Sequence, residues 1–193
     1  MQFKIDSIVL RKPKEEDANG FIEICSEKDT MKYYGVSGAD IDTYEKAMKQ
    51  IEWCNSLFQN NSGRWIITID GKDQYIGDIG FHNFQENNKK VEIGYRLKQA
   101  YWGKGIMSKC IQKLVKYGFS ELGYNRVEAY VDHRNEASAH LLRKNGFQFE
   151  GTLRECEFEH GSYVDLDVYS ILRREYKKEE NKLSQEVIDE EEN

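Results

Sequence analysis

The amino-acid sequence predicts an α/β (α+β) fold in which strands and helices alternate around one central sheet. Three observations support this prediction. Short segments with alternating apolar residues are repeatedly followed by amphipathic helical segments. A strand at residues 91–97 leads through a short Gly-x-Gly loop into a long helix with a continuous apolar face. The 193 residues, of which 39% are hydrophobic, are enough for one domain with a full-sized core.

The N-terminal half is expected to contain three strands and two helices. The elements, in order, are strand 3–12, helix 15–27, a helix that follows Thr43 and ends at 60–63, and strands 64–69 and 75–82. Pro13, the single proline, closes the first strand. Thr43 is the expected N-cap of the second helix, because its hydroxyl can accept a hydrogen bond from a free backbone N–H. The turn dipeptide Asp70-Gly71 predicts that the last two strands form a hairpin.

The C-terminal half adds four strands and two helices. The elements, in order, are strand 91–97, helix 106–122, strand 126–131, helix 135–145, and a hairpin of strands 147–157 and 163–172. Val127, Ala129 and Val131 alternate with Glu128 and Tyr130, as in a half-buried strand. The sheet should therefore contain about seven strands, without an internal repeat or an interdomain linker.

Charge and cysteine usage narrow the function classes. The net charge is −6, and residues 177–193 carry three Lys against seven acidic residues, so −4 of it lies in that segment. We expect residues 1–176 to form one domain and 177–193 an acidic tail. The chain lacks the basic stripe of a nucleic-acid binder and any apolar run long enough for a membrane helix. Four widely spaced cysteines indicate reduced thiols in a cytoplasmic protein, with no disulfide framework or metal site.

The Gly103-Lys104-Gly105 loop is the strongest local signal. It precedes a helix, whose first turn has four unsatisfied N–H donors and a partial positive charge, so a phosphate is the natural ligand. The loop is not a Walker A motif, because Gly105 stands where that motif has Ser or Thr. It is not a Rossmann fingerprint either, because Ser108 replaces the third glycine.

Four motifs in a fixed order resemble the GNAT N-acetyltransferase superfamily. They are Ile93-Gly94-Tyr95-Arg96-Leu97 with Trp102-Gly103-Lys104-Gly105-Ile106-Met107, the helix end Tyr117–Tyr124, Asn125–Ala129 with Asn135-Glu136-Ala137-Ser138, and Leu141–Phe147 with Glu150-Gly151. Together with Gly161–Asp165, they resemble the branch that acetylates N-terminal amines of ribosomal proteins, the RimJ/RimL-like enzymes. The resemblance covers residues 8–176. One departure is Ala100, where the superfamily often has Gln or Arg.

The resemblance implies a GNAT fold and an acetyl-CoA site. Its sheet is central, twisted, mixed and mostly antiparallel, with helices on both faces, and strands 91–97 and 126–131 splay into a V-shaped cleft for the cofactor. The pantetheine would pair with backbone near Ile93, Tyr95 and Leu97, and Asn135, Ser138 and Lys144 would contact the cofactor. The pyrophosphate would lie on the N–H groups of Trp102, Gly103, Lys104, Gly105, Ile106 and Met107.

The resemblance also assigns the chemistry, which is the attack of an amine on a thioester. Glu157 matches the general base and Ser138 the general acid that protonates the leaving thiolate. Three alternatives stay open at this point. Glu157 can instead anchor a cationic substrate, Glu155 is a neighbouring carboxylate, and His133 is a possible second base.

The expected activity is therefore acetyl transfer from acetyl-CoA to a primary amine by direct attack in a ternary complex, without a metal. The acceptor is a protein N-terminus, a polyamine or an aminated antibiotic, and the enzyme is a monomer or a homodimer. A non-catalytic acyl-CoA-binding module on the same fold is the alternative from another class, because a fold does not guarantee its chemistry.

Overall fold

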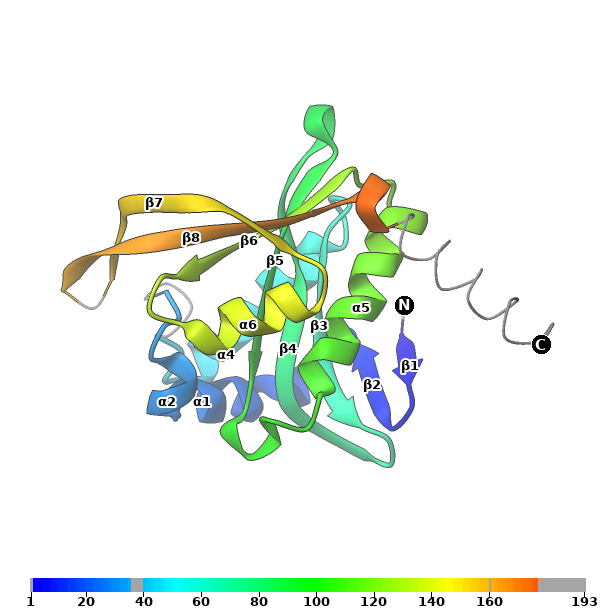
Figure 1. The fold of residues 1–193 in the computed structure, drawn as a ribbon. Coiled ribbons are helices and arrows are strands. Elements are labelled where there is room, and N and C mark those ends of the chain that lie inside the picture. Colours follow the sequence, from blue (N-terminus) through cyan, green and yellow to red (C-terminus); the bar gives the residue numbers. More distant parts are fainter. Residues whose placement is uncertain (1, 36–39, 160, 177–193) are drawn as a thin grey trace.

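Eight strands form one sheet in the order β1-β2-β3-β4-β5-β6-β8-β7 (Figure 1). The computed structural model describes residues 2–35, 40–159 and 161–176, so the expected tail 177–193 lies outside the described residues. Neighbouring strands are antiparallel except for β5 and β6, which confirms a mixed, mostly antiparallel sheet. The strands are β1 (Phe3–Ile5), β2 (Ile8–Arg11), β3 (Gly63–Ile69), β4 (Lys72–Gln85), β5 (Lys90–Leu97), β6 (Arg126–Asp132), β7 (Gln148–Glu159) and β8 (Ser162–Leu172).

The prediction of one strand over residues 3–12 was wrong. The segment folds back on itself as a tight hairpin, in which Ile5 pairs with Ile8. Asp6 makes this reversal with a φ of 51°, a left-handed conformation that Asp tolerates better than most residues. The extra turn explains why the sheet has eight strands instead of about seven.

The four predicted helices begin and end close to their expected positions, and one short helix, α2, was not predicted. The helices are α1 (Ala18–Ser26), α2 (Lys28–Met31), α4 (Tyr44–Leu57), α5 (Ile106–Ser120) and α6 (Glu136–Lys144), with 3-10 turns η1 (Glu15–Asp17), η2 (Glu86–Asn88) and η3 (Gln99–Tyr101). The predicted cap of α4 is confirmed, because Thr43 Oγ1 accepts a hydrogen bond from Lys46 N at 3.3 Å. Asn135 caps α6 in the same way through Ser138 N, at 3.1 Å. None of the helices in the described part of the chain has the length and apolar character needed to cross a bilayer.

Helices cover both faces of the sheet, as predicted (Figure 1). Trp65 and Ile67 of β3 pack with the apolar residues of α5 and α6 in one core cluster. Ile66, between them, points the other way and packs with α1 and α4 in a second cluster. This alternation follows from the two-residue period of a strand, and it defines an α5/α6 face and an α1/α4 face.

A buried ionic cluster ties three central strands together on the α1/α4 face. Asp78 of β4 accepts hydrogen bonds from Arg64 Nε of β3 at 2.6 Å and from Arg96 Nε of β5 at 2.7 Å. The phenol of Tyr75 donates to the same carboxylate, and Arg64 also donates to Tyr34 at 2.8 Å. Burial alone would raise the pKa of Asp78, but the two guanidinium groups outweigh it and hold that pKa below its ordinary value.

The strands β5 and β6 separate after a short parallel contact. They share three residue pairs, Lys90 with Arg126, Val91 with Val127 and Glu92 with Glu128. Beyond these pairs β5 continues to Leu97 and β6 to Asp132 without pairing to each other. The helix α5 makes the crossover that parallel strands require. The predicted V-shaped opening is therefore present, and it faces the start of α5 and α6.

Candidate active site

A cavity of about 620 Å³ lies at the open end of the V. Its walls come from α2 and the segment after it, from the end of β5, from the loop and first turn of α5, and from α6. The predicted site residues in its lining are Tyr95, Leu97, Trp102, Gly103, Gly105, Ile106, Met107, Asn135, Ser138 and Lys144. Residues that are up to 49 positions apart in the sequence, such as Tyr95 and Lys144, thus meet at one site.

Three predicted site residues lie outside this lining. The side chain of Ile93 is buried in the core against α5, so only its backbone is available to a ligand. Lys104 bends back on its own loop, where its Nζ donates to the Ala100 carbonyl at 2.8 Å. Glu157 is on β7 and is described below.

The loop before α5 has the geometry of an anion cradle. Gly103 and Gly105 have φ values of +70° and +72°, which glycine adopts without strain. A Cβ atom added to either glycine would meet no protein atom within 4 Å, so the space above both is open. Gly105 is the N-cap of α5 and offers no side chain to the first turn, whose N–H groups therefore remain available to a ligand.

Trp102 braces the end of β5. Its indole Nε1 donates to the Leu97 carbonyl at 2.6 Å, while much of the ring stays exposed beside the cavity. One of the two lone pairs of the Leu97 carbonyl is therefore already used by Trp102. The same hydrogen bond fixes the distance between the strand and the glycine loop.

Ser138 is held in place on the opposite wall. Its Oγ is 2.8 Å from the hydroxyl of Tyr95, and its amide donates to the Asn135 cap. Burial raises the pKa of Tyr95 to about 12, so the phenol stays protonated at neutral pH. A hydroxyl pair between β5 and α6 thus spans the cleft.

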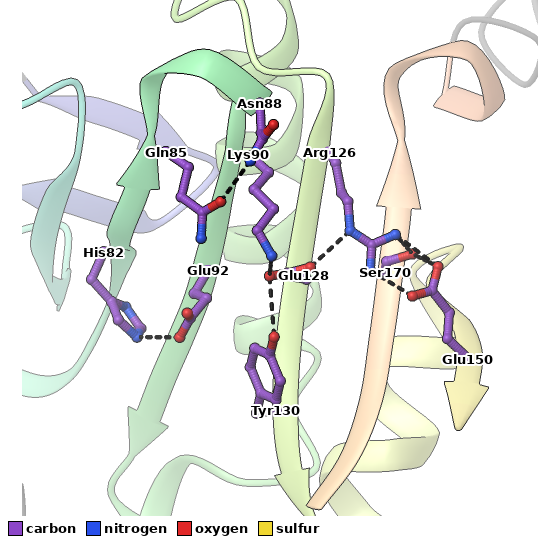
Figure 2. Close-up of polar contacts among 10 residues, drawn as sticks. All are labelled: His82, Gln85, Asn88, Lys90, Glu92, Arg126, Glu128, Tyr130, Glu150 and Ser170. Atoms are coloured by element: carbon purple, nitrogen blue, oxygen red, sulfur yellow. Dashed lines mark hydrogen bonds and ion pairs between the residues drawn. The ribbon is translucent and has the colours of Figure 1, made fainter. Parts of the chain in front are cut away.

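The α1/α4 face of the sheet carries a polar network where β5 and β6 separate (Figure 2). Lys90 Nζ and Arg126 Nε converge on the buried carboxylate of Glu128, at 2.5 and 2.7 Å. Glu92, which is paired with Glu128, lies 3.4 Å from His82 Nε2. Lys90 and Arg126 therefore neutralise Glu128, and the imidazole of His82 lies within ion-pair distance of Glu92.

Glu157 lies on this same face. It pairs with Val164 of β8. Val164 and Ser170 are an even number of residues apart on this strand, so they point to the same face, and Ser170 pairs with Glu128. The carboxylate accepts no hydrogen bond and forms no ion pair within the described residues. Partial burial, and then the negative charges of Glu159 and Glu92, raise its pKa above the ordinary value. Glu157 is thus a solvent-accessible carboxylate with increased basicity.

The histidines differ from one another. His133 follows β6 and its Nδ1 is 3.0 Å from Asp167, a contact that raises the imidazole pKa. His140 lines the cavity from α6. No group of three or more potential metal ligands occurs among the residues that the structure describes.

Sequence reasoning missed one wall of the cavity. Five residues of α2 and the segment after it contribute to the lining, namely Asp29, Thr30, Lys32, Tyr33 and Tyr34. No motif marks this segment, and its helix has only four residues. The two consecutive tyrosines are the one signal in the sequence that indicates a contact surface here.

Comparisons with known proteins identify the family of this chain. A family model described as an acetyltransferase (GNAT) domain matches residues 7–148. The N-acetyltransferase YoaA of Bacillus subtilis (strain 168) is 37% identical over 169 residues, which are 87% of this chain and 94% of the relative. The ribosomal-protein-serine acetyltransferase of Escherichia coli (strain K12) is 34% identical over 133 residues, which are 67% of this chain and 72% of the relative.

A solved structure shares both the fold and detectable sequence similarity. The microcin C7 self-immunity acetyltransferase MccE, in complex with acetyl-CoA and AMP, has a TM-score of 0.78 and 26% identity. The match covers 87% of this chain and 93% of that chain. This chain therefore belongs to the GNAT acetyltransferase family and is an acetyl-CoA-dependent N-acetyltransferase, with ribosomal-protein acetyltransferases among its relatives.

Proposed function

We propose that this enzyme acetylates the N-terminal α-amine of a protein, of the kind that ribosomal-protein acetyltransferases use. The observation that carries the proposal is the placement of Glu157, a carboxylate with no hydrogen-bond or ion-pair partner among the described residues, on the α1/α4 face beside the V. A fixed hydroxyl, Ser138, lies on the α6 side of the cleft. The similarity to the E. coli ribosomal-protein-serine acetyltransferase supports this class of acceptor.

The open glycine cradle and the free first turn of α5 fit the pyrophosphate of acetyl-CoA. When bound, acetyl-CoA supplies the activated acetyl group as a thioester. The backbone of β5 at Ile93, Tyr95 and Leu97 would hold the pantetheine arm. The loop and first turn would hold the phosphates, through Trp102, Gly103, Lys104, Gly105, Ile106 and Met107. Asn135, Ser138 and Lys144 would contact the cofactor from α6.

Glu157 would act as general base and Ser138 as general acid. Glu128 is a poor base because two cations hold its proton affinity down, whereas the pKa of Glu157 is raised. A higher pKa brings a carboxylate closer to the operating pH and strengthens it as a base. Ser138 would donate its hydroxyl proton to the leaving thiolate of CoA. The hydroxyl of Tyr95, which is hydrogen-bonded to Ser138 Oγ, would hold it in position.

The cost of deprotonating the acceptor also favours an α-amine. An α-amine with a pKa near 8 loses its proton at pH 7 at a cost of about 1.4 kcal/mol. A lysine side chain with a pKa near 10.4 requires about 4.6 kcal/mol. A single carboxylate base is therefore better matched to the α-amine.

The test is thiol release from acetyl-CoA across a panel of amines. The panel contains peptides with a free N-terminus, the same peptides with a blocked N-terminus and one lysine, spermidine, and an aminoglycoside. We expect the peptides with a free N-terminus to be the best substrates. Faster turnover of spermidine or the aminoglycoside would contradict the proposal, and tight CoA binding without any turnover would favour a binding module.

The glycine cradle yields a prediction with a matched control. Gly105→Ala should weaken CoA binding roughly tenfold or more, because a methyl group and a strained φ move the N–H groups that would meet the pyrophosphate. Gly71→Ala, in the β3–β4 turn, has the same left-handed strain at φ +76° and the same open surroundings, but lies outside the cavity lining. Calorimetry with CoA should show normal affinity for Gly71→Ala. Equal affinities for the two variants would disprove this placement of the phosphates.

A further inference from the structure

An irregularity in β7 determines which carboxylate lies opposite Val164 on the α1/α4 side of the sheet. Leu153 pairs with Leu166, and the next pair is Glu157 with Val164. Between these pairs β7 has three residues, 154–156, whereas β8 has one, Asp165. In a regular ladder Glu155 would lie opposite Val164. The two additional residues place Glu157 there instead, as a bulge can re-aim a side chain.

The bulge includes a residue in an unfavourable conformation. Glu155 has a φ of 48°, in the left-handed region that residues other than glycine rarely adopt. Such a conformation persists only where neighbouring groups enforce it. Glu155 N–H donates to the Asp165 carboxylate at 2.8 Å. A hydrogen bond to an ionised acceptor is among the stronger ones, so it can maintain this conformation.

Asp165 also ties the bulge to the rim of the cleft. Its backbone carbonyl accepts a hydrogen bond from His133 N, just after the end of β6, at 3.0 Å. One residue of β8 therefore fixes both the bulge that precedes Glu157 and the segment in which β6 leaves the V. Asp165 is one residue from Val164 along β8, so its side chain lies on the face of the sheet opposite to Glu157.

We propose that Asp165 is a positioning residue for Glu157, acting through its hydrogen bond to the Glu155 amide. This inference rests on the proposed function, in which Glu157 is the general base. Without the bond, Glu155 would relax from its left-handed conformation, and the ladder could return to a regular register in which Glu155 lies opposite Val164 and Glu157 is displaced by two residues along the strand. The acceptor amine would then lose its base, while the glycine cradle on the other wall would stay unchanged.

The kinetic test compares variants that break or keep this one bond. Asp165→Ala should lower kcat by roughly tenfold or more, with an unchanged KM for acetyl-CoA, since small misplacements of a catalytic group have effects of this size. Asp165→Asn keeps an oxygen acceptor for the amide and should restore most of the activity. Glu155→Gly keeps the N–H and relieves the strain, and should retain kcat within about twofold. Glu155→Pro removes the donor and also excludes the left-handed φ, so it should abolish the bulge and lower kcat at least as much as Asp165→Ala, which provides a second route if Asp165→Ala does not fold.

A double-mutant comparison separates positioning from a general structural role. In a Glu157→Gln background, Asp165→Ala should lower kcat by less than about twofold, because the group that it positions is already absent. A loss of the same size in both backgrounds would overturn the proposal.

A readout without turnover keeps this inference distinguishable from the proposed function. The carboxyl pKa of Glu157, followed by NMR, should lie above 4.5 in the native enzyme and fall toward that ordinary value in Asp165→Ala. An unchanged pKa would show that Asp165 does not position Glu157, whatever the activity. If the native enzyme acetylates no amine, the proposed function fails, and the NMR comparison still decides the role of Asp165.

Discussion

Replacing Asp78 with alanine should lower the free energy of unfolding by about 3–5 kcal/mol, or prevent folding, because it leaves two buried guanidinium groups without their counter-ion. Asp78 is 0% exposed, and Arg64 and Arg96 are 3% and 4% exposed. Neither arginine can reach bulk water without disrupting the central strands. Urea denaturation followed by circular dichroism measures the effect.

Asp73 of the same strand provides the matched control. It also binds two cations, Arg11 and Lys14, each at 2.5 Å, but its side chain is 55% exposed. Exposed ion pairs contribute little, so Asp73→Ala should cost less than about 1 kcal/mol. Equal losses for Asp73→Ala and Asp78→Ala would show that burial of the cluster does not matter.

The pH dependence of this difference has a definite sign. The pKa of Asp78 is depressed in the folded state, so its stabilising contribution is complete above the ordinary value near 3.8. It is lost as the pH falls through the folded pKa. The stability difference between native enzyme and Asp78→Ala should therefore be constant near neutrality and narrow below about pH 4.

Glu157→Gln should lower turnover by about a hundredfold at pH 7 while leaving CoA binding intact, since a general base contributes an effect of this order. The loss should be smaller at pH 9, where more of the acceptor amine is already neutral. Steady-state kinetics with a free-N-terminal peptide at both pH values measures this. In the native enzyme, activity should decline on acidification through the raised pKa of Glu157, because the protonated carboxyl cannot accept a proton.

Glu155→Gln is the control for this experiment. Glu155 is the neighbouring carboxylate, but its place in the bulge turns it away from the position opposite Val164. The turnover of Glu155→Gln should stay within about twofold of the native enzyme, because the hydrogen bond from the backbone amide of residue 155 to Asp165 remains. An equal loss at pH 7 and pH 9 in Glu157→Gln, with a raised acceptor KM, would instead identify Glu157 as an anchor for the substrate.

Local rules predicted most of the framework of this enzyme. The cap at Thr43, the Asp70-Gly71 hairpin and the glycine loop before α5 all depend on residues close together in sequence, and the structure contains each of them. The order of the four motifs predicted the splayed cleft, because it identified the whole fold.

Features that depend on register could not be predicted in this way. The Arg64–Asp78–Arg96 cluster joins residues 14 and 18 positions apart, and it forms only because three strands align at one level. A glycine would have indicated the bulge between Leu153 and Glu157, but the residue in the left-handed conformation there is Glu155. The tyrosines after α2 line the cavity, but they follow a helix of only four residues that the periodicity of the sequence does not reveal.

In the proposed binding mode, the short contact between β5 and β6 would link cofactor binding to the stability of the whole sheet. Strands β1–β5 and β6–β8 form two halves that share three residue pairs at this junction and are connected by the α5 crossover. A cofactor that contacts β5 on one side and α6 on the other bridges both halves. Part of its binding free energy then stabilises their relative orientation. By mass action, such a ligand at a hundred times its Kd adds about 2.7 kcal/mol to the free energy of unfolding. Residues at the junction therefore influence cofactor affinity without contacting the cofactor, as thermodynamic linkage requires.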